Sequence, residues 1–160
     1  MQSLEEYLNC EKMIRKFKSN DLKEILRLEQ KAFPKTPYDE LIFVFYARIY
    51  PDNFLVYVEE FSDKTVGYII FRPGGHIVSL AVDPMYERKG IGTKLVEEVF
   101  KVSNGYAKVE VRRSNKKAQM FYKKLGFFQS GSIPGFYDDE DAIVVIHSSD
   151  SEKSYLPKDS

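Results

Sequence analysis

The chain has 160 residues, a size typical of one domain and sufficient for a substantial hydrophobic core. Hydrophobic residues make up 43% and charged residues 30%, and 24 basic residues balance 24 acidic ones, so the formal net charge is zero. This balance argues against a nucleic-acid or anionic-membrane partner, and no apolar run approaches the roughly 18 residues of a membrane-spanning helix. The single cysteine, Cys10, excludes an internal disulfide, and the first residues lack the layout of a secretory signal. We therefore expect a cytoplasmic protein.

The first half of the chain predicts a strand, two helices and a β-hairpin after a short lead-in at 1–12. Apolar residues recur at helical spacing in both helical segments; Ser19 or Asn20 provides a cap for the first, and Pro51 ends the second. The two strands of the hairpin are β-rich runs joined by the polar tip FSDK. The expected elements are a strand at 13–18, helices at 19–33 and 38–49, and strands at 53–60 and 65–73.

The second half alternates strands with helices. The run HIVSLAVDP is almost continuously apolar, which predicts a strand buried on both faces. A glycine-containing turn then opens a helix whose residues Ile91, Leu95, Val99 and Val102 are expected in the core. The expected elements are strands at 76–84 and 107–113, helices at 91–102 and 114–126, strands at 127–133 and 141–148 around the loop PGFYDDE, and a polar tail at 149–160.

Together these elements predict a single α/β (α+β) domain over 13–148, between an N-terminal extension at 1–12 and a polar tail at 149–160. The order β-α-α-β-β-β-α-β-α-β-β predicts a mixed, mostly antiparallel sheet flanked by helices, because only the second half contains a strand-helix-strand unit. The chain shows no internal repeat and no linker that would suggest a second domain.

The turn MYERKGIGTKL places two glycines one residue apart among cations, directly before a helix. Backbone N–H groups at a helix start favour a bound anion, and glycine allows a ligand to approach the main chain closely. A Walker loop is excluded because one residue, not four, separates Gly90 from Gly92, and a dinucleotide fingerprint is excluded because Leu95 stands in place of its third glycine. Taken alone, the turn is either an anion site or only a tight strand-to-helix connection.

Three segments carry a more specific signal: SLAVDPMYERKGIGTKL, VEVRRSNKKAQMFYKKLGF and FYDDEDAIVV. Together they resemble the GNAT acyltransferase superfamily and, within it, the protein N-terminal acetyltransferases of the ribosomal-protein-alanine type. The likeness covers about 13–148. It implies the GNAT fold, acetyl-CoA as co-substrate without a metal, and a protein or peptide N-terminus as acceptor. The family usually has Gln or Arg where this chain has Glu87, which we expect to reorient one phosphate contact without abolishing binding.

The resemblance also implies a set of acetyl-CoA-binding residues. The strand before the turn would pair its main chain with the pantetheine amides, and the turn would hold the pyrophosphate. Asn115 either contacts the cofactor while capping its helix or acts as a cap alone. The implied residues are Leu80, Ala81, Val82, Arg88, Lys89, Gly90, Ile91, Gly92, Thr93, Asn115 and Tyr122.

Two side chains are the candidates for acid–base catalysis. Glu110, whose side chain is expected on the opposite face from Val109 and Val111, is the candidate general base for a protonated α-amine. Tyr122 is the candidate donor of a proton to the departing thiolate. Pattern alone also allows a solvated Glu110 that pairs with Lys108 or Arg112, and a Tyr122 that is only a core aromatic.

Phe33, Tyr38 and Tyr137 match positions that bind the peptide in the family, although each is equally consistent with a packed loop aromatic. His76 and His147 have no second ligand at metal spacing, so no metal site is predicted. We expect the amine to attack acetyl-CoA directly in a ternary complex, because the only cysteine lies outside the motifs. The sequence does not determine the oligomeric state, which we expect to be a monomer or a weak dimer. A lysine or small-amine acetyltransferase and a non-catalytic CoA-binding module remain open alternatives.

Overall fold

The structure is a computed structural model that describes residues 3–5 and 13–149. Most of the predicted N-terminal extension, including Cys10, and most of the predicted tail therefore lie outside the described residues. The predicted order of elements is confirmed. The strands and helices are β1 (Ile14–Lys16), α2 (Leu22–Ala32), α3 (Glu40–Ile49), β2 (Phe54–Val58), β3 (Thr65–Arg72), β4 (His76–Val82), α4 (Ile91–Val102), β5 (Ala107–Arg112), α5 (Lys116–Lys124), β6 (Phe128–Tyr137) and β7 (Glu140–His147).

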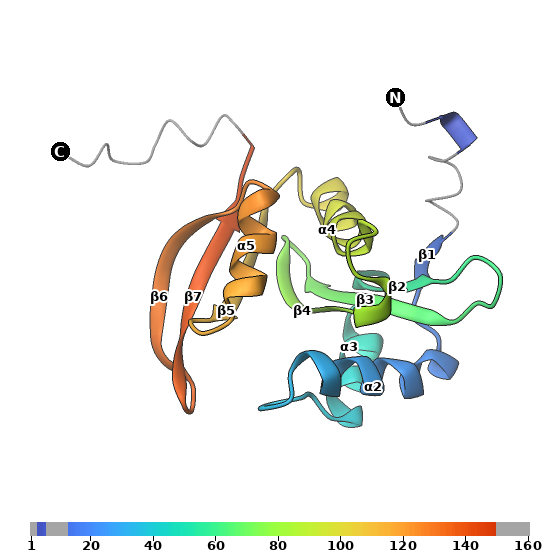
Figure 1. The fold of residues 1–160 in the computed structure, drawn as a ribbon, viewed down its shortest axis with the longest axis horizontal. Coiled ribbons are helices and arrows are strands. Elements are labelled where there is room, and N and C mark those ends of the chain that lie inside the picture. Colours follow the sequence, from blue (N-terminus) through green and yellow to red (C-terminus); the bar gives the residue numbers. More distant parts are fainter. Residues whose placement is uncertain (1–2, 6–12, 150–160) are drawn as a thin grey trace. The chain divides into compact units, whose positions relative to one another are not determined.

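The strands form a seven-stranded sheet in the order β1-β2-β3-β4-β5-β7-β6 (Figure 1). The pairs β1–β2, β2–β3, β5–β7 and β6–β7 are antiparallel, whereas β4 and β5 are parallel and pair at His76 and Lys108. The predicted fold class, a mixed and mostly antiparallel α/β sheet, is thus confirmed. Residue contacts divide the chain into two compact units, Met1–Pro73 with Val78–Glu97 and Gly74–Ile77 with Glu98–Ser160.

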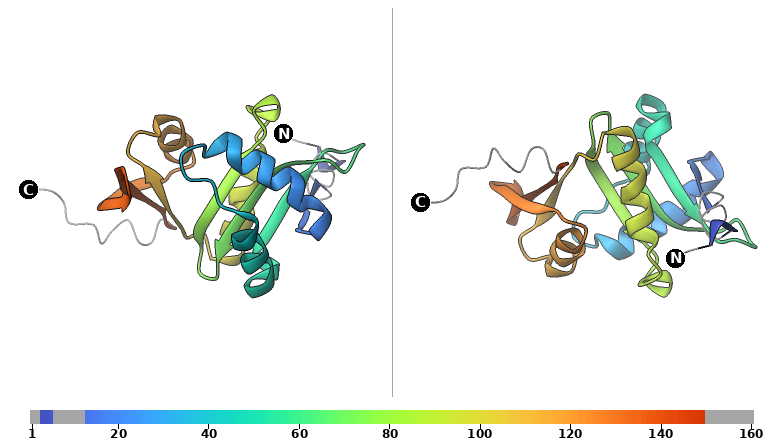
Figure 2. Two further views of the ribbon diagram at one scale, coloured as in Figure 1. Left: turned by 90° about the horizontal axis from the view of Figure 1, so that it is seen from below. Right: turned by 90° about the horizontal axis from the view of Figure 1, so that it is seen from above.

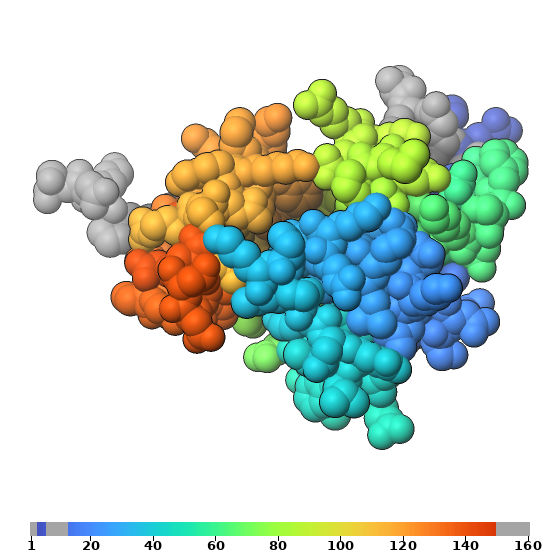
Figure 3. Space-filling model, turned by 60° about the horizontal axis from the view of Figure 1, so that its bottom comes forward, coloured from blue at the N-terminus to red at the C-terminus, as the bar shows by residue number. Residues whose placement is uncertain are grey.

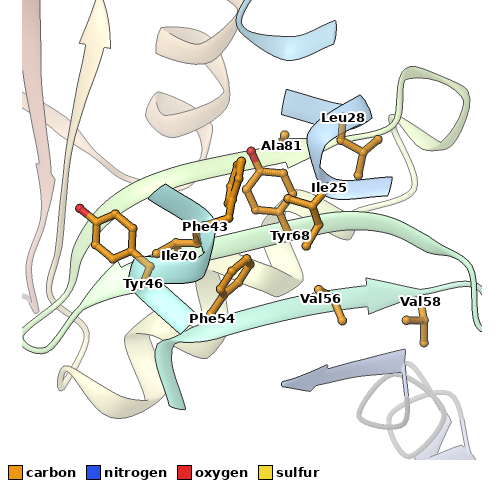
Figure 4. Close-up of a cluster of buried hydrophobic side chains, with 10 residues drawn as sticks. All are labelled: Ile25, Leu28, Phe43, Tyr46, Phe54, Val56, Val58, Tyr68, Ile70 and Ala81. Carbon is orange, nitrogen blue, oxygen red and sulfur yellow. The ribbon is translucent and has the colours of Figure 1, made fainter. Parts of the chain in front are cut away.

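The first unit has a layer of strands between helices. Helices α2 and α3 cover one face of β2 and β3, and the beginning of α4 lies on the other face (Figure 2). A Cβ atom at Gly67 on β3 would lie 3.2 Å from Ile91 Cγ2, so glycine allows α4 to pack closely on this strand. The core beneath α2 and α3 is rich in aromatic rings (Figure 4); its buried members are Ile25, Leu28, Phe43, Tyr46, Phe54, Val56, Val58, Tyr68, Ile70 and Ala81.

The second unit contains β5, β7 and β6 together with α5. Its packing includes a cluster of rings in which His147 stacks on Phe100 with centroids 4.3 Å apart, and Tyr122 contacts Phe127 at 5.0 Å. His147 Nδ1 lies 2.6 Å from the carbonyl oxygen of Gly105, which joins the end of β7 to the loop after α4. These contacts assign His147 a packing role. Among the described residues, no helix has the length and apolar character needed to cross a membrane.

The predicted cap of the first helix is wrong. A 3-10 turn, Ser19–Asp21, precedes α2, so neither Ser19 nor Asn20 is the residue before the helix. Asp21 takes that position and is buried, because its two carboxylate oxygens accept hydrogen bonds from the Arg15 guanidinium at 2.8 and 2.9 Å. An ion pair with the preceding strand therefore accompanies Asp21 at this position, in place of a serine or asparagine cap.

Two burial predictions are also wrong. The strand predicted at 76–84 is not buried on both faces: Ile77, Ser79 and Ala81 are buried, while the residues between them are half-buried. This alternation leaves one face of β4 less covered than an apolar run suggested. Val102 is 70% exposed, because it is the last residue of α4.

Strand β6 is longer than the sequence predicts. It runs through Pro134 to Tyr137, so four of the seven residues of the predicted loop PGFYDDE belong to the strand. Proline is tolerated because β6 is an outer strand of the sheet, where a missing N–H need not break a ladder. The register with β7 shifts between Ile133 and Tyr137, at this proline.

Candidate active site

The turn between β4 and α4, which is predicted to bind an anion, contains two left-handed residues shortly before the helix begins. After Val82 the chain forms a 3-10 turn, Pro84–Tyr86, and α4 begins at Ile91. Arg88 and Gly90 have φ angles of 64° and 77°, a left-handed conformation that is unusual for arginine. The start of α4 adds backbone N–H groups that have no partner within the helix and that favour a bound anion. The residues predicted to hold phosphate are thus gathered in one exposed turn.

The side chains around this turn differ in what they can contribute. Ile91 is buried in the core of the first unit, so its backbone alone is available to a ligand. Lys89 Nζ lies 5.1 Å from the centre of the Tyr86 ring, so part of the positive charge of the turn rests on an aromatic face. Ala81 on β4 is likewise buried, while Leu80 and Val82 are half-buried. Any role of this strand in binding therefore falls to its main chain.

Glu110 occupies the position on β5 that the alternation predicts. Val109 and Val111 are buried, and the Glu110 side chain on the other face is 12% exposed. Its Oε2 lies 2.6 Å from His76 Nε2, and its Oε1 lies 3.8 Å from Lys108 Nζ. The carboxylate is thus held between two nitrogen groups of the second unit.

This environment sets the protonation of Glu110. Burial alone would raise the pKa of Glu110, but the hydrogen bond and charge of His76, together with the charge of Lys108, outweigh it and leave the pKa below its ordinary value. Glu110 is therefore ionised at neutral pH, which a proton acceptor requires.

His76 was missed by the sequence reasoning, which considered it only as a metal ligand. The signal was present in the topology: β4 and β5 are parallel neighbours, and His76 is the register partner of Lys108. Glu110 follows Lys108 by two residues and so shares its face of β5. Among the described residues, no group of three or more His, Cys, Asp or Glu side chains is arranged to hold a metal ion.

Tyr122 lies on α5 within the second unit and is 5% exposed. The centroid of its ring lies 5.0 Å from those of Phe121 and Phe127. Tyr122 thus packs as a core aromatic, and this packing does not test its proposed role as a donor. Burial, with a contribution from nearby Tyr137, raises the pKa of Tyr122 well above its usual range. The phenol therefore keeps its proton at neutral pH, and can act as a hydrogen-bond donor to a developing negative charge.

Tyr137 is tied to the same part of the second unit. Its hydroxyl donates to the carbonyl oxygen of Glu110 at 3.4 Å, and the Arg112 guanidinium lies 4.2 Å from the centre of its ring. Arg112 Nη1 also contacts Asp139 at 2.7 Å and Glu140 at 3.0 Å, which holds the β6–β7 hairpin against β5. The structure thus brings Tyr137 next to the strand that carries Glu110.

The sequence allows Ser114 or Asn115 as the cap of α5, and the structure shows that it is Asn115: its Oδ1 accepts the Ala118 N–H at 3.1 Å. The oxygen retains a second lone pair and the amide nitrogen has two N–H donors, so the cap does not prevent the side chain from contacting a cofactor. The cap is therefore confirmed, and the cofactor contact stays a prediction.

Phe33 and Tyr38 lie in the first unit, at the two ends of the connection between α2 and α3. The Phe33 N–H donates to the Glu29 carbonyl at 2.8 Å, and the Tyr38 N–H donates to Glu29 Oε1 at 3.1 Å. Glu29 itself is 2% exposed, and its Oε2 accepts hydrogen bonds from the hydroxyls of Tyr68 and Ser79. The Tyr38 main chain is thus held by the side chain of a buried glutamate, whereas the Phe33 bond is an ordinary main-chain bond at the end of α2.

Comparison with known proteins extends across both units. Residues 20–127 match the sequence model of the Acetyltransferase (GNAT) family. An uncharacterized N-acetyltransferase from Methanocaldococcus jannaschii is 38% identical over 153 residues, covering 90% of this chain and 96% of that protein. An N-alpha-acetyltransferase from Sulfurisphaera tokodaii is 33% identical, covering 82% and 90%. The crystal structure of Chaetomium thermophilum Naa20 in complex with a bisubstrate analogue has a TM-score of 0.77 at 25% identity, covering 91% and 92%.

Proposed function

Because this chain belongs to the acetyltransferase (GNAT) family and is an acetyl-CoA-dependent N-acetyltransferase, we propose that its acceptor is the α-amino group of a protein or peptide N-terminus. Relatives that carry the name N-alpha-acetyltransferase support this acceptor. The observation that carries the proposal is the ionised, largely buried carboxylate of Glu110, whose main chain bonds to Tyr137.

An α-amino group has a pKa of about 8, so most of it is protonated at neutral pH and cannot attack a thioester. Glu110 accepts the proton, either directly or through a water molecule, and His76 shares the resulting change in charge. Because the pKa of Glu110 is below its ordinary value, Glu110 is a weak base that is always available. Its contribution therefore comes from position and not from high basicity.

The first unit contains the residues that bind the thioester co-substrate, acetyl-CoA. The turn at 87–93 binds the pyrophosphate of acetyl-CoA through its N–H groups, and the main chain of Leu80–Val82 pairs with the pantetheine amides. One of these backbone N–H groups stabilises the carbonyl oxygen as it gains negative charge.

The reaction is then a direct acyl transfer. The amine nitrogen forms a bond to the acetyl carbon, the carbon–sulfur bond breaks, and the electron pair leaves with sulfur. Tyr122 stabilises the thiolate by donating a hydrogen bond to it. Of the two protons that the ammonium nitrogen loses on becoming an amide, the first is taken by Glu110 and the second passes to the thiolate, directly or through water, which gives the CoA thiol. No side chain carries the acetyl group, so the kinetics should be those of a ternary complex.

The test is release of CoA thiol across peptides that differ in their first two residues. Each peptide is also supplied with a blocked N-terminus and a free lysine. Acetylation restricted to free N-termini supports the proposal. Acetylation of the blocked, lysine-containing peptides would replace it with a lysine acetyltransferase. Binding of acetyl-CoA without turnover on any peptide would leave a small amine as acceptor, or a non-catalytic role.

A further inference from the structure

We propose that Arg27 on α2 is a positioning residue for the acetyl-CoA phosphate turn, and that it acts through the buried side chain of Asp83. Arg27 lies outside the binding motifs, and no ligand contact is assigned to it. The inference rests on the proposed binding of the pyrophosphate by residues 87–93, and it names the element that holds this turn in place.

Asp83 is the point at which the turn is attached to the first unit. Its side chain is 2% exposed. Its N–H donates to the Val66 carbonyl on β3 at 2.8 Å, and its own carbonyl accepts from the Tyr86 N–H at 2.8 Å. Its Oδ1 accepts the Met85 N–H at 3.0 Å, which caps the 3-10 turn. One residue thus connects a core strand to the segment that leads into the phosphate turn.

Arg27 completes the coordination of this carboxylate. Its Nη2 donates to Asp83 Oδ2 at 2.9 Å, so each oxygen of Asp83 has a partner. Burial would raise the pKa of Asp83, but the hydrogen bonds from Arg27 and the Met85 N–H, with the charge of Lys31, keep the pKa below its usual value. A buried carboxylate that loses its cation must either be protonated or draw solvent toward it, and both change its geometry.

The same arginine contacts a second carboxylate that provides an internal comparison. Arg27 Nε donates to Glu24 Oε2 at 2.9 Å, and both side chains are 34% exposed. An exposed pair of this kind contributes little, because water competes for both partners. The influence of Arg27 on the turn therefore runs through Asp83. In the space-filling view, α2 and the segment around 84–90 lie side by side (Figure 3).

Asp83 is one of the anchors of the segment that leads into α4. A second anchor is the Tyr86 hydroxyl, which donates to Glu59 Oε2 at 3.1 Å. Beyond Tyr86 the turn is exposed and includes Arg88 and Gly90 at positive φ, a conformation that depends on how its ends are held. A displacement of Asp83 is therefore passed to the N–H groups that bind phosphate, where misplacement by about 1 Å is costly.

The experiment compares Arg27→Met with Glu24→Gln as matched control, after circular dichroism has shown that both fold. Calorimetry with CoA, which needs no acceptor, should show affinity about tenfold weaker for R27M and unchanged for E24Q. Turnover of S-acetyl-pantetheine, which lacks the pyrophosphate and nucleotide, should be the same for R27M and wild type. This combination separates loss of the phosphate contacts from general damage to the site.

Unchanged CoA affinity in R27M, or an equal loss with acetyl-CoA and acetyl-pantetheine, would overturn the inference. Arg27→Lys, which retains a cation, should recover part of the CoA affinity. If R27M does not fold, Asp83→Asn provides the same test, because its amide oxygen can still cap Met85 while the charge that Arg27 pairs with is lost. Addition of R27M to D83N should then cause no further loss. Wild-type CoA binding without peptide acetylation would refute the proposed acceptor and leave this inference standing.

Discussion

Two buried glutamates, one in each unit, have pKa values that their surroundings shift in opposite directions. Glu29 in the first unit is buried among a backbone N–H and two hydroxyls, and burial raises its pKa above the ordinary value despite these hydrogen bonds. Glu110 in the second unit is also largely buried, but His76 and Lys108 lower its pKa. Neutral partners satisfy the oxygens of Glu29 without supplying charge, whereas the His76 hydrogen bond and the nearby Lys108 charge keep Glu110 ionised. The comparison supports an architectural role for Glu29 and the proton transfer that is proposed for Glu110.

The strongest test of this contrast is a matched pair of amide substitutions. Glu110→Gln removes the proton acceptor and should lower kcat by about a hundredfold or more, within the range for general-base catalysis. Affinity for CoA, measured by calorimetry, should be unchanged. Glu29→Gln should retain most of the turnover. Similar losses of kcat in both variants would show that the two carboxylates do not have separate roles.

The second prediction concerns stability. Glu29→Ala leaves the Tyr38 N–H and the hydroxyls of Tyr68 and Ser79 without their shared acceptor, and should lower the free energy of unfolding by about 2 kcal/mol in urea. E29Q should lose less, because its amide oxygen still accepts from Tyr38.

Wild-type Glu29 adds a pH dependence to this result. Because folding raises the pKa of Glu29, its contribution to stability is largest below the unfolded pKa of about 4.3 and is lost as pH rises through the folded pKa. The stability of wild type relative to E29Q should therefore fall between acidic and neutral pH. The opposite trend would mean that Glu29 is stabilised as a carboxylate.

The third prediction compares two buried tyrosines. Tyr122→Phe should reduce kcat by about tenfold with little change in unfolding free energy, because no hydrogen bond of its hydroxyl is found within the described residues. Tyr68→Phe should show the reverse, since its hydroxyl bonds to Glu29 and Ser79. Steady-state kinetics and urea unfolding of both variants test these two predictions. A stability loss without a rate loss in Y122F would reduce Tyr122 to a packing residue.

The smallest predicted effect is a change in the pKa of Glu110. His76→Gln removes the hydrogen-bond and charge contribution of His76 and should raise the pKa of Glu110, as followed by carbon-detected NMR titration with E110Q used for assignment. Because the base must be ionised, loss of activity at acidic pH should begin at a higher pH than in wild type. Lys108→Met, which removes a charge at 3.8 Å, should cause a smaller rise. An unchanged pKa of Glu110 in both variants would show that His76 and Lys108 do not control its protonation.

Sequence reasoning succeeded where local patterns decide the structure. The order of elements followed from periodicity, the Asn115 cap from its position before α5, and the orientation of Glu110 from alternation with Val109 and Val111. It failed where distant segments meet. The contact between His76 and Glu110 joins residues 34 apart in the chain and requires the parallel register of β4 and β5.

The same limit explains the other omissions. Glu29 joins a helix to β3 and β4, through Tyr68 and Ser79, and nothing near it in the sequence marks those partners. Arg27 resembles any arginine on a half-exposed helix until Asp83 is placed beside it. Strand β6 was predicted too short because Pro134 was read as a loop signal, whereas an outer strand accommodates it.

Pro134 also affects how the molecule behaves among its own copies. An outer strand with a continuous row of free N–H and C=O groups can recruit a strand from another molecule, the first step of edge-to-edge aggregation. On β6 that row is interrupted, because Pro134 has no N–H and the register shifts beside it. The pyrrolidine ring of Pro134 thus hinders the pairing of β6 with a strand of another molecule.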